Sequence, residues 1–284
     1  MFKHVDLSLP KLTRETIDGV RYYSVPDEDE LLRLVSITSV TSHFNKDIFV
    51  NWRKKVGNEE ADRITKAATT RGTDMHTLTE HYLKNDEELP KVPPISDFLF
   101  KISKGKLNKI DNIYCLEGSL YSRELGIAGT VDCIAEYDGE LSIIDFKTSK
   151  KPKPKEWIEH YFVQAMSYGC MLYELTGITV KKLVIIMACE NGECVVYEEY
   201  DKRKYIKLLT KYIRKFVGDN SKIMFCGDAT QSDLTKTNDR NGIVDFMKIL
   251  TSMPSVDIIE FGLDDIIRSG LVKEYLVAKL ELGM

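Results

Sequence analysis

Several features that would assign a function at once are missing from this chain of 284 residues. No run of about 18 apolar residues is present, as a membrane-spanning helix would require. The first residues lack the apolar stretch of a secretory signal peptide. There is no internal repeat, and no glycine-rich loop of the kind that holds phosphate groups between a strand and a helix. We therefore expect a protein of the cytoplasm without a membrane partner.

The six cysteines are scattered along the chain, and no two of them have the Cys-x-x-Cys spacing. This distribution argues against a zinc ribbon and against a disulfide framework. It also argues against an iron–sulfur cluster, which normally needs four clustered thiolates. Cys133 and Cys170 fall in segments expected to be buried, where a free cysteine acts as a small hydrophobic side chain.

An excess of positive charge is also missing, since the formal net charge is −4. Basic residues are nevertheless concentrated locally. Five lysines and no acidic residue lie between Phe146 and Lys155, which favours contact with phosphate groups there. Two other basic clusters are Lys101, Lys104, Lys106 and Lys109, and then Lys202, Arg203, Lys204, Lys207, Lys211, Arg214 and Lys215. A solvated helix face explains the last cluster equally well.

A β-hairpin is predicted in the middle of the chain. Two β-type runs, 128–137 and 140–147, flank the dipeptide Asp138-Gly139, and Asp-Gly between such runs is a strong signal for a two-residue turn. In the register that this turn sets, Tyr137 faces Glu140, and each step outward adds one residue to each strand.

The same register places Asp132 opposite Asp145. Directly opposed residues share a face of the sheet, with Cβ atoms about 4.5–5.5 Å apart, and Lys147 lies on that face two residues further on. Two opposed carboxylates repel each other unless a cation lies between them. Oxygen ligands suit Mg²⁺ or Mn²⁺, so the hairpin predicts a metal site with a lysine beside it. The competing interpretation is a surface strand with scattered charges.

The order of elements predicts a mixed α/β sheet sandwich, an α+β fold, rather than a doubly wound fold. The expected elements are a helical region at 46–84, a helix at 96–108, strands at 113–121, 128–137 and 140–147, a helix at 156–175, a strand at 182–188, a second hairpin through Asn191-Gly192 to 200, and a helix at 201–217. Trp52 is expected to pack inside the helical region. The expected divisions are a lead-in at 1–45, a core at 46–217, a polar linker or loop at 218–240 and a helical tail at 241–284.

Five motifs in this order resemble those of PD-(D/E)XK nucleases of the RecB type. They are His76 within Arg71-Gly-Thr-x-x-His76, Glu117, Gly129-x-x-Asp132, Asp145-Phe-Lys147-Thr-Ser149 and Gln164-x-x-x-Tyr168. The resemblance covers about residues 35–215 and is best for the branch of mitochondrial genome maintenance exonucleases and their phage relatives. Val131 precedes Asp132 where the name of the superfamily has proline, as is normal for the RecB branch. If a phage encodes the chain, its location is the host cytoplasm.

The resemblance implies a restriction-endonuclease-like αβββαβ core with a helical lead-in and a small helical tail. It implies Mg²⁺ or Mn²⁺ on His76, Asp132, Asp145 and the backbone carbonyl of Phe146. Lys147 would be the catalytic lysine and Glu117 a supporting residue, while Gln164 and Tyr168 would orient the site and contact the strand. The residues expected to contact DNA are Arg71, Thr148, Ser149, Lys150, Lys151, Lys153, Gln164 and Tyr168. Glu80, one turn after His76, is expected either to support it or to be an exposed helix residue.

We therefore expect a metal-dependent exonuclease that degrades single-stranded DNA from free ends in replication, recombination or repair. A helical gate at about 45–70 would favour free ends, and the tail would contact a replication or recombination protein or merely pack on the core. The alternatives are a structure-specific endonuclease and a DNA-binding protein without catalytic activity.

Overall fold

A computed structural model describes residues 1–26, 31–220 and 248–253. The chain divides into two compact units, residues 1–221 and 222–284. Within the second unit, the described part is a short helical piece near Lys248. Most of the linker predicted at 218–240 and most of the tail predicted at 241–284 lie outside the described residues. In the described part of the chain, no helix is both long enough and apolar enough to cross a membrane.

The predicted core is confirmed. Helix α4 (Pro94–Leu107) is followed by β4 (Ile110–Ser122), β5 (Ile127–Tyr137), β6 (Glu140–Ser149), a 3₁₀ turn η1 (Lys155–Ile158), α5 (Glu159–Thr176) and β7 (Lys182–Cys189). The chain continues through β8 (Cys194–Glu199) into α6 (Lys202–Asn220). This is the αβββαβ order within a mixed, mostly antiparallel sheet of eight strands.

The lead-in is helical from α1 (Ile37–Phe44) through α2 (Lys46–Val56) and α3 (Asn58–Leu83), but strands come before it. The unpredicted strands are β1 (Thr13–Ile17), β2 (Val20–Pro26) and β3 (Leu31–Ser36). The turn between β1 and β2 is Asp18-Gly19, with φ of 50° and 79°. Asp138 and Gly139 have nearly the same values, 49° and 79°, so both Asp-Gly pairs make the turn expected for that dipeptide.

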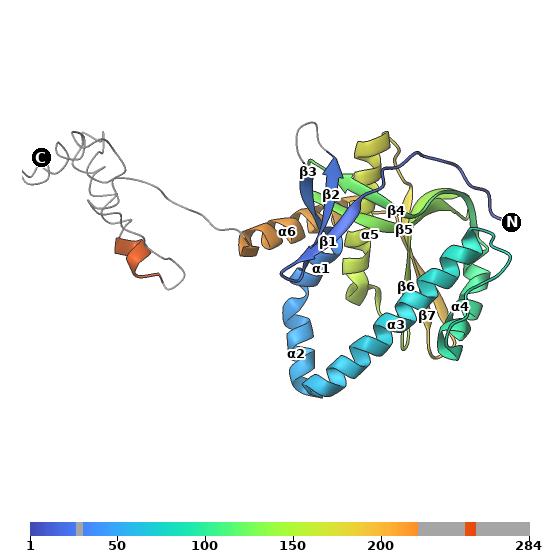
Figure 1. Cartoon of the computed structure of the whole chain (residues 1–284), viewed down its shortest axis with the longest axis horizontal. Helices are drawn as coiled ribbons and strands as arrows, with labels where there is room; N and C mark the ends of the chain where they lie inside the picture. The colour runs from blue at the N-terminus through green and yellow to red at the C-terminus, as the bar shows by residue number, and fades with distance from the viewer. Residues whose placement is uncertain (27–30, 221–247, 254–284) are drawn as a thin grey trace, which may run out of the picture. The chain divides into compact units, whose positions relative to one another are not determined.

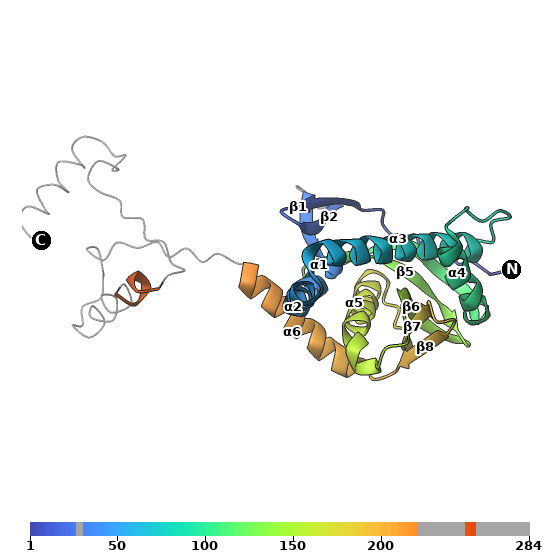
Figure 2. The ribbon, with the colours of Figure 1, turned by 90° about the horizontal axis from the view of Figure 1, so that it is seen from below.

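Helices cover both faces of the sheet. Side chains of α1, α5 and α6 pack with strand residues in one hydrophobic cluster, and side chains of α3 and α4 pack in a second. Figure 2 shows β6 and β7 between α4 on one side and α5 on the other. Every residue of β7 is buried, as expected for a strand covered on both faces.

The edge of β5 opposite β4 has two partners, which leave a gap between them. Parallel β3 pairs with its first residues, Ile127 and Ala128, and antiparallel β6 pairs with residues 133–137. The recorded pairs leave 129–132 without a strand on this edge. The backbone groups of residues 129–132 on this edge are therefore not paired with β3 or β6, and side chains can enter the gap.

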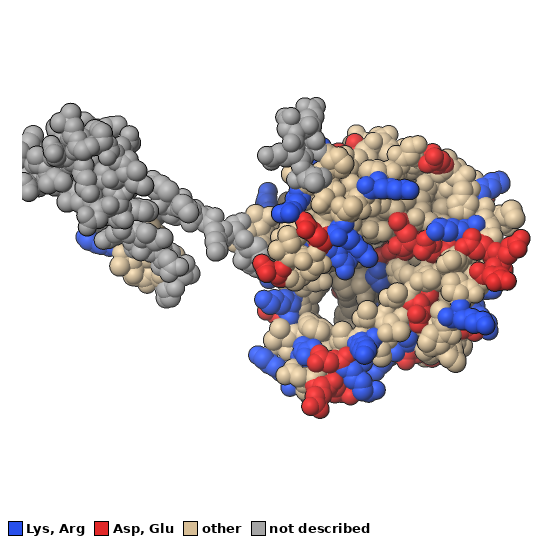
Figure 3. All heavy atoms as spheres, viewed as in Figure 1, with Lys and Arg blue, Asp and Glu red and all other residues tan. Residues whose placement is uncertain are grey.

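Helices α2 and α3 form an arch that stands off this body (Figure 1). No residue of α2 is buried, and Trp52 is only partly covered, so its predicted interior packing is wrong. Figure 3 shows an opening between the arch and the rest of the unit. The second half of α3 leaves the arch and packs on the sheet through Met75 and Leu78.

Candidate active site

The predicted hairpin register is confirmed as far as the pairs extend. Tyr137 pairs with Glu140, and the pairing continues to Cys133 and Ile144. Asp132 and Asp145 occupy the next position, where the two strands separate. There Oδ2 of Asp132 accepts a hydrogen bond from the backbone N–H of Phe146 at 2.8 Å. The Asp132 carboxylate thus lies in the gap of the sheet and is 7% exposed.

Strand β4 brings a third carboxylate to this position. Its pairs Leu116–Cys133 and Gly118–Val131 flank Glu117 and Asp132, so these two acids are neighbours across the strands. Glu117 has a φ of 49°, an uncommon conformation for a non-glycine residue, and outside turns such strained conformations cluster at functional sites. A Cβ on Gly118 would lie 2.1 Å from Sγ of Cys115, which explains the glycine there.

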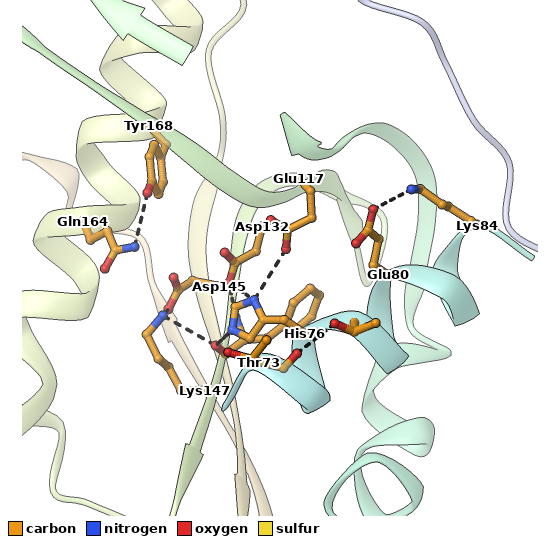
Figure 4. Close-up of polar contacts among 12 residues, drawn as sticks. Thr73, His76, Glu80, Lys84, Glu117, Asp132, Asp145, Lys147, Gln164 and Tyr168 are labelled. Atoms are coloured by element: carbon orange, nitrogen blue, oxygen red, sulfur yellow. Dashed lines mark hydrogen bonds and ion pairs between the residues drawn. The ribbon is translucent and has the colours of Figure 1, made fainter. Parts of the chain in front are cut away.

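Helix α3 supplies His76 to the same place (Figure 4). Nδ1 of His76 lies 3.5 Å from Oε1 of Glu117 and 3.7 Å from Oδ2 of Asp132. Ligand atoms of these three residues all lie within 4.8 Å of one another. A group of one imidazole and two carboxylates fits a Mn²⁺ or Mg²⁺ ion.

The other nitrogen of His76, Nε2, donates a hydrogen bond to the carbonyl oxygen of Phe146 at 2.8 Å. This bond fixes the orientation of the ring and turns Nδ1 towards the carboxylates. The Phe146 carbonyl, whose role as a metal ligand stays a prediction, accepts this hydrogen bond in the structure. Glu80, one turn along α3, pairs with Lys84 at 2.5 Å and does not support His76; Glu117 occupies that place.

The surroundings of His76 favour its protonated form. Burial disfavours the imidazolium, but the charges of Asp132 and Glu117 outweigh burial and raise the pKa of His76 to about 9. A neutral imidazole is needed to coordinate a metal ion. If His76 binds a metal ion, as predicted, the ion would have to compete with the proton at neutral pH.

We expect metal affinity to rise with pH because of this competition. Below pH 9 each bound Mn²⁺ must displace the His76 proton, so the affinity should increase about tenfold per pH unit between pH 6 and 8. Titration calorimetry in two buffers of different ionisation enthalpy measures the number of protons released on binding, and we expect about one proton per Mn²⁺ ion. His76→Gln should release almost none. A wild-type protein that binds Mn²⁺ without proton release would contradict this assignment.

Asp145 and Lys147 form an ion pair on the other side of Asp132 (Figure 4). Nζ of Lys147 lies 2.5 Å from Oδ2 of Asp145, and Asp145 is 1% exposed. Burial raises the pKa of Asp145 to about 6 despite the nearby ammonium group. Its Oδ1 has no hydrogen-bond partner in the described part of the chain. A buried carboxylate oxygen without a partner is expected beside a cation site.

Asp145 was predicted to bind metal with His76 and Asp132, and that role stays a prediction. In the structure the Asp145 carboxylate pairs with Lys147. The group whose ligand atoms lie within 4.8 Å of one another consists of His76, Glu117 and Asp132. Asp132 stands between the two pairs, His76 with Glu117 and Asp145 with Lys147.

Helix α5 places Gln164 and Tyr168 beside the gap, as Figure 4 shows. Nε2 of Gln164 donates to the hydroxyl of Tyr168 at 3.2 Å. Tyr168 is 1% exposed, so the predicted contact between its side chain and DNA is not available in this structure. The Tyr168 hydroxyl holds the side chain of Gln164 through this hydrogen bond, and Gln164 is only partly covered.

Gly129 explains how Tyr168 can lie so close to β5. A Cβ at Gly129 would lie 2.8 Å from Cε1 of Tyr168 and 3.1 Å from Cγ2 of Ile37. Gly129→Ala should therefore displace the Tyr168 ring and lower the free energy of unfolding by about 1–3 kcal/mol, measured by urea denaturation. Gly105→Ala is the matched control, because a Cβ there meets nothing within 4 Å. Equal stability of the two variants would show that the ring is not confined as described.

Some of the residues predicted to contact DNA are bonded to other residues of the chain, and others are exposed. Arg71 pairs with Glu190 at 2.8 Å, and the backbone N–H and carbonyl of Lys153 bond to the hydroxyl of Tyr197. Lys150 and Lys151 are exposed. A hydrogen bond from Arg63 lowers the pKa of Glu60 at the start of α3, with a smaller contribution from the charge of Lys150, so Lys150 lies within electrostatic range of Glu60. Thr148 and Ser149 are the last residues of β6 and are partly covered.

Tyr161 belongs to the site although no role was predicted for it. Its ring centroid lies 5.1 Å from Nζ of Lys147 and 5.8 Å from Nζ of Lys153, distances at which an ammonium group is attracted to a ring face. The sequence signal was its position three residues before Gln164, on the same helix face. Next to it, burial and the charges of Lys153 and Lys147 lower the pKa of His160 to about 4.

Three curated proteins are similar to part of this chain. Mitochondrial genome maintenance exonuclease 1 of Mus musculus is 30% identical over 109 residues, which cover 36% of this chain and 32% of that protein. The protein of the same name from Homo sapiens is 34% identical over 91 residues, covering 30% and 26%. That of Xenopus tropicalis is 32% identical over 108 residues, covering 36% and 31%. The chain thus spans about a third of the length of the curated relatives it matches.

Two other comparisons contribute less. A family model described as PhoH-like protein matches residues 202–279, a minor share of the chain that lies mostly outside the described residues. A crystal structure of an exonuclease candidate from Eubacterium rectale covers 66% of this chain and 80% of its own, with 13% identity and a TM-score of 0.39; likeness at that level carries no argument. The curated relatives relate part of this chain to exonucleases.

Proposed function

We propose that this chain is a metal-dependent DNA exonuclease of the PD-(D/E)XK superfamily, RecB type, acting on single-stranded DNA. The observation that supports it most is the position of Asp132 between the His76–Glu117 pair and the Asp145–Lys147 pair. The partial similarity to mitochondrial genome maintenance exonuclease 1 points to the same activity. Replication, recombination or repair of DNA is the proposed setting.

The proposed metal is Mg²⁺ or Mn²⁺, which His76, Asp132, Asp145 and the Phe146 carbonyl would hold, with the Glu117 carboxylate next to His76 and Asp132. Such an ion, when bound, polarises a phosphoryl oxygen and lowers the pKa of a bound water. The hydrogen bond between Nε2 of His76 and the Phe146 carbonyl keeps Nδ1 directed at the Glu117 and Asp132 carboxylates. Lys147 orients the attacking water and stabilises negative charge that develops on the phosphate. Gln164, held by Tyr168, would contact the strand on the side of α5.

The arch supports the proposal that free ends are the substrate. His76 and the arch share helix α3, so a strand that reaches the site lies close to the opening seen in Figure 3. A strand with a free end can be threaded through such an opening, whereas a closed circle cannot. The exposed lysines after β6 offer phosphate contacts next to it.

The test compares a linear single strand with a covalently closed circle of the same sequence, with Mg²⁺ or Mn²⁺ and with chelator. The linear strand should be degraded at least about 100-fold faster, because only it can enter the opening, and the chelator should stop the reaction. Labels at either end of the linear strand report the products. A circle cut as fast as the linear strand would favour the structure-specific endonuclease instead. No cleavage of either, with DNA binding intact, would favour the non-catalytic DNA-binding protein.

A further inference from the structure

One face of helix α2 is apolar and uncovered. No residue of this helix is buried. Ile48 is 70% exposed, Phe49 46% and Val56 36%, and Trp52 is partly covered. At 3.6 residues per turn these four side chains fall within an arc of about 100°. Single exposed apolar residues are ordinary, but four on one face of one helix form a surface that lacks an occupant among the described residues.

Two of these side chains form an aromatic pair. The ring centroids of Phe49 and Trp52 lie 5.5 Å apart with an interplanar angle of 34°. The guanidinium carbon of Arg53 lies 5.8 Å from the Phe49 ring centroid, and Nη1 of Arg53 bonds to Asp62 of α3 at 2.7 Å. The ion pair joins α2 to α3 next to the aromatic pair.

Basic residues border the apolar face on both sides. By helix geometry Lys46 and Arg53 follow one border and Lys55 the other, and both lysines are exposed. Aromatic rings between cations are the combination that binds single-stranded nucleic acid, because bases stack on the rings while the cations contact phosphates. The exposed bases of a single strand can stack there, whereas those of a duplex are already stacked and paired.

We propose that the Ile48–Val56 face of α2 is a base-stacking platform that grips single-stranded DNA at the opening of the arch. Phe49 and Trp52 stack on bases, and Lys46 and Lys55 contact the backbone. This inference rests on the proposed function and adds the residues that select an unpaired strand. Stacking tolerates any base, so the platform holds a strand of any sequence while it advances towards Asp132.

The chain offers a direct optical test because it has two tryptophans. The second, Trp157, is 71% exposed on η1. In a Trp157→Phe variant Trp52 is the sole tryptophan, and its fluorescence should be quenched by oligothymidylate in the presence of chelator, which keeps the strand intact. An abasic strand with the same number of phosphates should bind more weakly and leave the fluorescence nearly unchanged.

Affinity provides a second measurement. The Phe49→Ala/Trp52→Ala double variant should lose about 5-fold to 150-fold in affinity for oligothymidylate by fluorescence anisotropy, as stacking is worth about 1–3 kcal/mol per base. Its affinity for the abasic strand should equal that of the wild type. Tyr173→Ala is the control, an aromatic residue that is 58% exposed and belongs to α5 instead of α2. Thermal unfolding monitors the fold of each variant.

The outcomes separate this inference from the proposed function. Unchanged affinity of the double variant, or quenching of Trp52 by anionic vesicles but not by DNA, would overturn the platform. DNA that binds with quenching of Trp52 but is never cut in Mg²⁺ or Mn²⁺ would support the platform and overturn the nuclease. If the wild type cleaves DNA and the α2 variants bind DNA as well as the wild type does, the nuclease would be supported and the platform overturned.

Discussion

Lys147→Ala is expected to abolish cleavage while the protein stays folded and binds DNA. The ammonium of Lys147 is the one cationic group bonded to Asp145 in the described structure, and its removal takes away the charge that would stabilise the reacting phosphate. Loss of one such group typically lowers turnover by about 10²–10³-fold. Cleavage of an end-labelled single strand measures the rate, and fluorescence anisotropy measures the binding.

The fold should survive because Asp145 has an alternative to its ion pair. Burial already raises the pKa of Asp145, while Lys147 opposes that rise. Without Lys147 the pKa of Asp145 goes further up, so the carboxylate takes up a proton at neutral pH instead of remaining a buried lone charge. Lys101→Ala is the control, since Lys101 lies exposed on α4 and pairs with Asp97 one turn away. Cleavage by Lys147→Ala at the rate of this control would remove the central role of the lysine.

The hairpin could be read from the sequence because its signals are local. Asp138-Gly139 fixes the turn, and a side-chain period of two then fixes every later pair, so the register out to Cys133 and Ile144 followed from counting. The same reasoning identified α5 and the buried strand β7. Strands β1 and β2 were not predicted because β1 is almost wholly exposed and lacks the alternation of apolar residues. The turn dipeptide Asp18-Gly19 was nevertheless present in the sequence.

The sequence could name candidate site residues and the register of the hairpin, but not how the segments around the hairpin are arranged. Sequence order cannot show that β3 and β6 share an edge of β5 and leave a gap at Asp132. It also cannot show that Lys147 pairs with the Asp145 carboxylate, or that Glu117 lies beside His76. Tyr168 of α5 can be buried because Gly129 of β5 has no Cβ that would occupy the space of its ring. These features arise from contacts between segments far apart in the chain.

Asp132→Asn is expected to remove metal binding with almost no change in shape. The Asn side-chain oxygen can still accept the hydrogen bond from the Phe146 N–H that Oδ2 accepts at 2.8 Å, so the gap in the sheet should keep its form. The negative charge next to Nδ1 of His76 is lost. We expect the affinity for Mn²⁺ to fall at least about 100-fold, since second-shell changes alone cost about 10–100-fold, and cleavage to fall with it. Titration calorimetry measures the affinity.

Asp138→Asn is the matched control, because Asp138 lies in the turn of the same hairpin, is exposed and pairs with Lys109. Asn is favoured in that turn, so the control should bind Mn²⁺ as the wild type does. Saturating Mn²⁺ should also stabilise the wild type and the control against heat, by about 2.7 kcal/mol at 100 times the dissociation constant. It should leave Asp132→Asn unchanged. Equal stabilisation of all three proteins would place the ion elsewhere, and cleavage that persists in chelator would show that Asp132 acts without a metal.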